Sequence, residues 1–225
     1  MPTIQTVVLS CVGLLSSLMS TSQKLLIDGS VTYNVSVIAI NRPVPAGLEG
    51  ATLTVLLKPF ESRTELKTRV GTETTFYDNR KGKGAILKEF SGQKLMITLN
   101  PGNWQHKNHV FSNLRFTPES RDSVISGQYV RSASAILRGG DRMFVFYAPD
   151  IRLQNLHYSY ALPQLDGLPV LFEIESAGVI FTYILTQLSF DPLPTSKFII
   201  PQNGFRIMTY EETRELNEEK ELNKR

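Results

Sequence analysis

Apolar residues alternate with polar ones in many short stretches, and this period of two constrains the fold more than any other feature. In "ATLTVLL", residues 51–57, the period places Leu53, Val55 and Leu57 on one face and the threonines on the other. Similar stretches recur along the chain between turns rich in Gly, Pro, Asn and Asp. The pattern predicts an all-β protein, either a sandwich, a jelly roll or a barrel.

The turn residues define the expected strands. The most clearly bounded pair is residues 169–175 and 179–188, joined by Ser176-Ala177-Gly178 as a β-hairpin. Residues 61–92 lack a steady apolar period, which predicts a long loop or mobile hairpin with a short strand at 85–87. The other strands are expected at 24–30, 32–40, 51–57, 93–100, 110–116, 127–137, 142–148, 156–162 and 197–201.

The chain divides into three parts on this pattern. Residues 1–23 carry no charge, and they form either a buried helix or strand pair, or a targeting or membrane-contacting segment. Residues 24–208 form a jelly-roll-like sandwich. Residues 209–225 form a charged helix, because Thr209 and Glu212 make a capping-box pattern ahead of helix-forming residues. Its few apolar positions predict a solvated or partner-seeking helix.

Residues typical of catalysis or metal binding do not form a convincing set. The sequence has no nucleophile elbow, no phosphate-binding loop and no dinucleotide fingerprint. His106 and His109 read as loop histidines, and Glu173 with Glu175 as an outward-facing polar pair. The single cysteine, Cys11, excludes an internal disulfide. We therefore expect no enzyme, no catalytic or metal site and no cofactor.

The best functional candidate is a basic segment between residues 63 and 88. Its seven cations face only three acidic residues, so its local charge of +4 exceeds the +3 of the whole chain. A cationic loop of this kind suits phosphate contacts, and Phe76 and Tyr77 could stack on unpaired bases. A solvated loop kept soluble by charge is the alternative. The predicted nucleic-acid-binding residues are Arg63, Lys67, Arg69, Arg80, Lys81, Lys83 and Lys88.

Three runs together resemble a known family. "KLLIDGSVTYNVSVIAINRPVPAGLEGATLTVLLKPFESR", "KLMITLNPGNWQHKNH" and "VISGQYVRSASAIL" resemble the core of the thirty-kilodalton superfamily of plant-virus movement proteins. The resemblance covers residues 24–147 and matches Gly127 to the family's later glycine. Lys58 stands where the family has an aspartate.

The resemblance implies a viral movement-type protein that binds single-stranded RNA without sequence preference. It also implies peripheral membrane contact, self-association, a protein partner for the helical tail, and a location at plasmodesmata and in the host cytoplasm. One alternative is a matrix protein in the inner layer of a negative-strand RNA virion. Another is a sliding-clamp-like protein or a secreted β-sandwich binding protein, in which case the sequon at Asn34 would matter.

Overall fold

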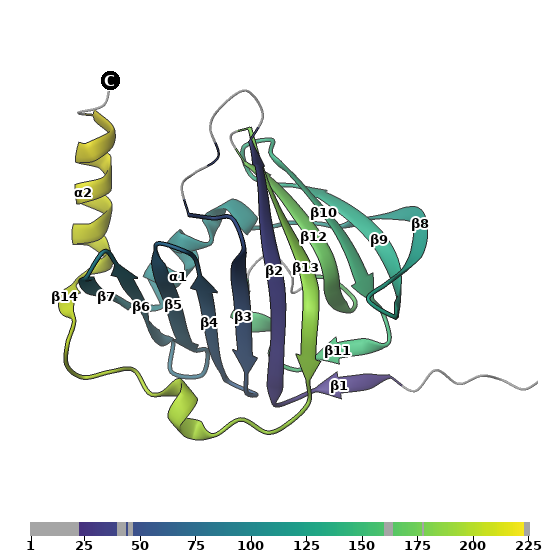
Figure 1. The fold of residues 1–225 in the computed structure, drawn as a ribbon, viewed down its shortest axis with the longest axis horizontal. Helices are drawn as coiled ribbons and strands as arrows, with labels where there is room; N and C mark the ends of the chain where they lie inside the picture. The colour runs from purple at the N-terminus through teal and green to yellow at the C-terminus, as the bar shows by residue number, and fades with distance from the viewer. Residues whose placement is uncertain (1–22, 40–43, 45–46, 160–163, 177, 223–225) are drawn as a thin grey trace, which may run out of the picture.

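The computed structural model describes residues 23–39, 44, 47–159, 164–176 and 178–222. Most of the strands follow one another as an antiparallel meander in one twelve-stranded sheet (Figure 1). Its order is β14-β7-β6-β5-β4-β3-β2-β13-β12-β10-β9-β8. These strands are β2 (Gly29–Ala39), β3 (Ala51–Leu57), β4 (Glu61–Lys67), β5 (Gly71–Asp78), β6 (Lys83–Phe90), β7 (Gln93–Leu99), β8 (Thr117–Ile125), β9 (Gln128–Ile136), β10 (Arg142–Ala148), β12 (Leu168–Ser176), β13 (Val179–Ser189) and β14 (Arg206–Met208).

Shorter elements complete the fold. β1 (Lys24–Leu26) and β11 (Ile151–Leu153) form a separate parallel pair. The helices are α1 (Pro101–Lys107) and α2 (Tyr210–Leu222), and the 3-10 turns are η1 (His109–Phe111), η2 (Leu156–Tyr158) and η3 (Thr195–Phe198). In the described part of the chain, neither helix is long and apolar enough to cross a membrane.

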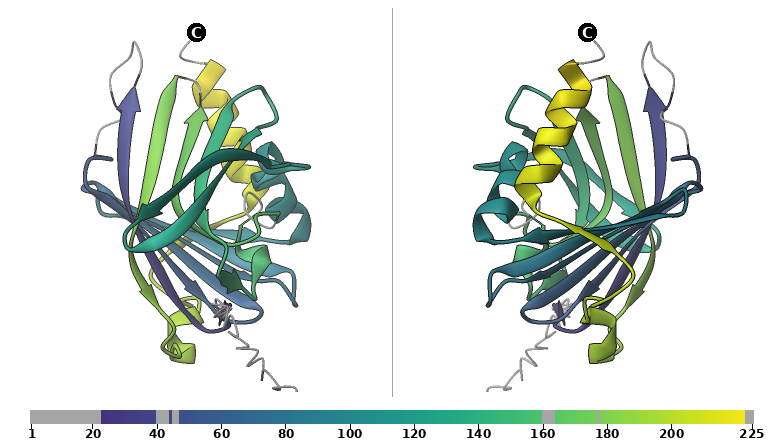
Figure 2. Two further views of the ribbon diagram at one scale, coloured as in Figure 1. Left: turned by 90° about the vertical axis from the view of Figure 1, so that its right-hand side faces the viewer. Right: turned by 90° about the vertical axis from the view of Figure 1, so that its left-hand side faces the viewer.

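The large sheet bends around the side on which α1 lies (Figures 1 and 2). Its inner face carries the main core, because the period of two directs one side chain in two toward that face. Tyr33 of β2 pairs with Leu53 of β3, and Val31 pairs with Val55, so these residues share the inner face. Leu57 and Val55 are fully buried there, and Leu53 packs against them, which confirms the predicted inward face of β3.

The outer face of β5–β7 is covered by the segment that follows β13. This segment passes through η3 and reaches β14, which adds to the sheet parallel to β7 (Figure 1). Its residues Ile200 and Phe205 pack on a cluster formed by Phe76, Ala85, Leu87 and Met96. The β5–β7 part of the sheet is therefore buried on both faces.

Several predictions are confirmed by this architecture. The protein is mainly β, a helix occupies the C-terminal tail, and β12 and β13 form the predicted hairpin. The jelly-roll detail stays a prediction, and twelve of the described strands belong to one sheet. Residues 1–22, Ala177 and the end of the tail lie outside the described residues.

Three other predictions were wrong. Residues 61–92 were predicted as a long loop or mobile hairpin with a short strand at 85–87. They form β4, β5 and β6 instead, and the predicted short strand lies within β6. Three stretches predicted as strands contain 3-10 turns instead: residues 110–116, the described part of 156–162, and residues 197–201. His106, predicted to lie in a loop, belongs instead to α1, which forms because Asn100 caps the helix and Pro101 occupies its first turn.

Candidate binding cavity

A cavity of about 270 Å³ lies between the inner face of the sheet and the α1–η1 region. Most of the side chains around it are apolar or aromatic. Strands from both halves of the sheet contribute lining side chains, and so do α1, η1 and η2. The lining residues are Tyr33, Leu53, Val55, Thr64, Thr75, Trp104, Lys107, Asn108, Phe111, Met143, Tyr158, Ser159, Phe172, Ile174 and Tyr183.

Aromatic side chains build one wall of the cavity. Phe172 stacks on Tyr183 with ring centroids 4.4 Å apart, and the edge of Tyr33 meets the Phe172 ring at 5.4 Å. The Tyr33 hydroxyl donates a hydrogen bond to the carbonyl of Pro169 at 3.0 Å. Burial raises the pKa of Tyr33, Tyr158 and Tyr183, so these phenols stay neutral and the wall carries no charge.

The helix α1 is fixed over the inner face by its cap and by one tryptophan. The side chain of Asn100 accepts a hydrogen bond from the Asn103 amide, and the Asn103 side chain accepts one from the Asn100 amide. Trp104 stacks on Tyr77 of β5 with ring centroids 4.1 Å apart. Asn108 donates to the Trp104 carbonyl at 2.8 Å. These contacts set the last turn of α1 against the cavity.

Lys107, at the end of α1, brings an amine to the cavity wall. Its Nζ lies 6.0 Å from the centroid of the Trp104 ring. Burial lowers the pKa of Lys107, and the carboxylate of Glu73 partly opposes that effect. It is the only residue with a formal charge among the described residues that line the cavity.

Two other hollows differ from this cavity in their chemistry. One, of about 450 Å³, lies on the other side of Trp104, where Arg80 packs over Phe60 at 4.9 Å. Its remaining lining residues are Pro59, Tyr77, Asn79, Gln154 and His157.

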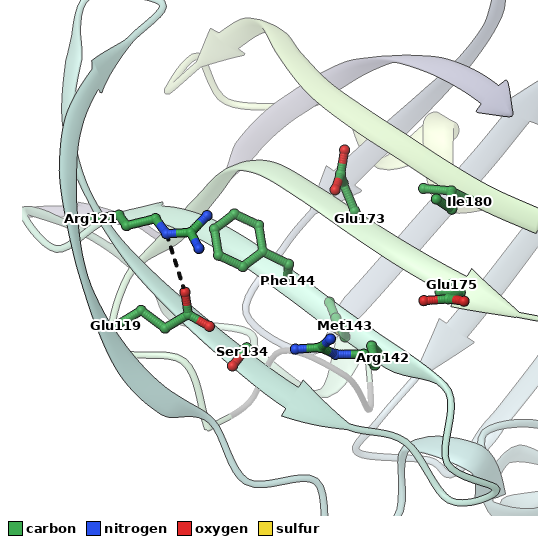
Figure 3. Close-up of a pocket in the computed structure, with 9 residues that line it drawn as sticks. All are labelled: Glu119, Arg121, Ser134, Arg142, Met143, Phe144, Glu173, Glu175 and Ile180. Atoms are coloured by element: carbon green, nitrogen blue, oxygen red, sulfur yellow. Dashed lines mark ion pairs between the residues drawn. The ribbon is translucent and has the colours of Figure 1, made fainter.

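The other hollow lies on the outer face, at β8, β10 and β12 (Figure 3). Arg121 pairs with Glu119 and lies over Phe144, 5.7 Å from the centroid of its ring. Glu173 accepts a hydrogen bond from Thr182. Charges of both signs face this hollow, so it lacks the single polarity that would select one class of ligand.

The predicted basic residues do not form one surface. Arg63 lies on the outer face of β4, where it pairs with Glu65, whereas Lys88 lies on the inner face and pairs with Glu73 at 3.2 Å. Three of the others are in turns or at strand ends: Arg69 pairs with Glu49, Lys81 pairs with Asp78, and Arg80 covers Phe60. Lys67 ends β4 and Lys83 begins β6.

The two predicted stacking residues are buried. Phe76 is 5% exposed and packs in the outer cluster, whereas Tyr77 is 9% exposed and stacks on Trp104 at the inner face. Because successive residues of a strand point to opposite faces, these two rings cannot act together on one ligand.

The histidine pair connects α1 to the tail. His106 Nδ1 lies 3.1 Å from the Tyr210 hydroxyl, and His109 Nδ1 lies 2.8 Å from the His106 carbonyl. Within the described residues, no group of three or more His, Cys, Asp or Glu is placed to hold a metal ion.

Sequence reasoning did not predict the cavity, although two signals pointed toward it. The alternation in β3 placed Leu53 and Val55 on the correct face. The run Asn100-Pro101, with Asn103 three residues after Asn100, carries the start signals of a helix. No sequence signal showed that this helix would lie over the same face.

No protein-family model and no curated protein matches the chain. Solved structures do match. PNGF-II aligns at 13% identity with a TM-score of 0.45 over 80% of this chain, which spans only 31% of PNGF-II. Lipoprotein LppX of Mycobacterium tuberculosis aligns at 10% identity and a TM-score of 0.40, covering 73% of this chain and 88% of LppX. The LolA superfamily protein NE2245 of Nitrosomonas europaea aligns at 11% identity with a TM-score of 0.36. The alignment covers 78% of this chain and 91% of NE2245.

These findings correct the predicted function. The predicted basic loop is part of a paired sheet, and its aromatic residues are buried. A viral movement function, a single-stranded nucleic-acid partner, and a location at plasmodesmata or in a virion are therefore wrong for this chain.

Proposed function

We propose that this protein binds a small, mainly apolar molecule of the lipid class in the cavity beneath α1, without catalysing a reaction on it. The observation that supports the proposal is the cavity itself, whose walls are apolar and aromatic side chains held by both halves of the sheet. Small-molecule sites are typically concave, mostly apolar and lined by a few placed polar groups. Of the earlier alternatives, a β-rich binding protein is closest to this proposal.

The chemistry of the lining residues supports a binding role. Among the described residues around the cavity, the groups able to exchange a proton are the Lys107 amine and the phenols of Tyr33, Tyr158 and Tyr183. Acid–base catalysis works best with groups whose pKa lies near the operating pH, and burial moves the phenols away from it. The cavity is better suited to hold a ligand than to transform one.

Filling the cavity tests the proposal. Thr64 and Thr75 are cross-strand partners whose side chains line the cavity floor. Replacing Thr75 by Phe places a ring in the ligand's volume, so we expect the affinity for N-phenyl-1-naphthylamine, an uncharged apolar dye, to fall at least about tenfold, which is about 1.4 kcal/mol. Dye fluorescence during titration measures this affinity.

The matched control is Thr52→Phe, which adds the same ring to the opposite face of β3, away from the cavity residues. We expect this variant to bind the dye as the unchanged protein does. A protein that does not bind the dye, or that binds it equally well with Phe at position 75, contradicts the proposed function. Thermal unfolding of both variants shows that each is folded during the titration.

A further inference from the structure

The cavity contains one cation whose counterion is not supplied by the described protein. Lys107 makes no hydrogen bond and no ion pair with any other described residue, although its side chain is more than half buried against the cavity wall. The nearest acidic group acting on it, Glu73, is bound to Lys88 at 3.2 Å. The ammonium group therefore faces the cavity without a partner of opposite charge.

The rest of the cavity cannot supply that partner. Its phenols are neutral, because burial raises the pKa of Tyr33, Tyr158 and Tyr183, and its other lining groups are apolar, hydroxyl or amide side chains. Burying a charged group without a paired charge is unfavourable, and an opposite charge placed beside it offsets that cost. A ligand whose anionic group lies at Lys107 would provide this compensation.

The position of Lys107 also fits a ligand with two chemically different ends. The amine stands at the last residue of α1, near the Trp104 ring, whereas Phe172, Ile174 and Tyr183 line the cavity from other elements, β12 and β13. A lysine stem packs along apolar surface while its amine holds the polar end. A molecule in the cavity would meet an apolar wall along its chain and a cation at one end.

We propose that the ligand is an acidic amphiphile, a medium- or long-chain carboxylate whose chain fills the cavity and whose acid group pairs with Lys107. This inference rests on the proposed function and adds the chemical class that the site selects. The side chain of Lys107 is the specificity-determining residue, since it distinguishes an acid from an alcohol or ester with the same chain.

Binding of three ligands with the same ten-carbon chain tests the inference. Isothermal titration at pH 7 with decanoate, 1-decanol and methyl decanoate compares one anion with two neutral molecules. We expect decanoate to bind at least about tenfold more tightly, as is typical of a charge-assisted hydrogen bond in a partly buried site. Lys107→Met should remove this preference and leave the affinity for 1-decanol unchanged or higher, and Lys107→Arg should preserve it.

A matched control removes one positive charge elsewhere. Lys67 lies on the outer face of β4, away from the cavity residues. The variant Lys67→Met should therefore still bind decanoate more tightly than 1-decanol. Equal affinities for the acid and the alcohol, or an equal loss of both in Lys107→Met, would overturn the inference while the cavity remained a lipid site. Failure of all three ligands and of the neutral dye would instead reject the proposed function.

The pH dependence of ligand affinity in the unchanged protein provides a test that does not depend on a variant folding correctly. Burial lowers the pKa of Lys107, so its amine loses the proton at a lower pH than an ordinary lysine does. Glu73 and Lys88 are the other charged groups acting on it, and they form an ion pair with each other. The decanoate affinity should therefore fall as pH rises through the lowered Lys107 pKa, whereas the 1-decanol affinity should not. Parallel pH profiles would contradict the inference.

Discussion

Arg63 binds the segment between β13 and β14 to the outer face of the sheet. Its guanidinium lies over the Phe76 ring at 5.4 Å, pairs with Glu65 and donates a hydrogen bond to the Lys197 carbonyl at 3.2 Å. Its Nε is buried without a hydrogen-bond partner among the described atoms. A residue predicted to bind phosphate thus has a structural role, because the partner it meets is the chain's own later segment.

Replacing Arg63 by Met should lower the free energy of unfolding by about 1–3 kcal/mol, the range for losing a charge-assisted hydrogen bond and leaving its acceptors unpaired. Thermal denaturation measures this loss, and limited proteolysis should cut faster between residues 190 and 205. Arg69→Met is the control, since that side chain is 73% exposed and its contact with Glu49 is long, at 3.8 Å. Equal stability of the two variants would show that Arg63 does not anchor the segment.

The helix α2 depends on its first turn. Glu212 accepts hydrogen bonds from the Thr209 amide at 2.7 Å and from the Thr209 hydroxyl, and these bonds lower the pKa of Glu212. A backbone hydrogen bond and the amide of Asn103 lower the pKa of Glu211. A helix of 13 residues is marginal in water on its own, so these contacts help to decide whether it forms.

We expect α2 to weaken in acid. Glu211 and Glu212 both have a folded-state pKa below the ordinary value for a glutamate. Their carboxylates therefore stabilise the docked helix fully when the pH is above the ordinary pKa. This stabilisation is lost as the pH falls through the lowered pKa. Helicity of residues 210–222, followed by NMR Cα chemical shifts, should therefore fall between about pH 5 and pH 3.

The matched variants separate this effect from general acid unfolding. The double variant Glu211→Gln, Glu212→Gln should have lower helicity at pH 7, and its helicity should change less with pH. Glu215→Gln on the same helix, where the described structure gives the carboxylate no contact, should keep the steep profile. A double variant whose profile matches that of the unchanged protein would disprove the role of the two carboxylates.

The composition of β4, β5 and β6 explains why the apolar period of two did not predict these strands. Their inner face holds Glu73, Thr75 and Tyr77, and their outer face holds Thr74 and Phe76, so both faces mix polar and apolar residues. Both faces are covered, one by α1 and the other by the C-terminal segment. Apolar and polar residues alternate in a strand when only one of its faces is buried, and the alternation is lost where both faces are covered.

The segment after β13 joins two distant parts of the chain on one sheet. It covers the outer apolar cluster with Ile200 and Phe205, and it supplies β14 as the strand beyond β7. Segments far apart in the sequence therefore cooperate in one folding unit. The sheet cannot be separated into an independent N-terminal part without exposing its apolar outer face.

Truncation after Ser189 should destabilise the protein by about 5 kcal/mol, because two or three large apolar side chains lose burial worth about 1.5–3 kcal/mol each. The expected fall in Tm is about 10–20 °C, measured by calorimetry, with self-association detected by sedimentation. Truncation after Met208, which removes α2 but keeps the covering segment, should cost less than half as much. Equal losses would place the stabilisation in α2 instead.

Local sequence patterns were enough to predict the mainly β class, the inward face of β3, the β12–β13 hairpin and the C-terminal helix. These features follow from alternation, turn residues and capping residues, all of which act over a few neighbouring positions. Three features depend on tertiary contacts: the strands form one bent sheet, α1 covers its inner face, and Lys107, Tyr33 and Phe172 line one cavity. Such contacts join residues far apart in the chain, and the curvature that brings them together has no local signature.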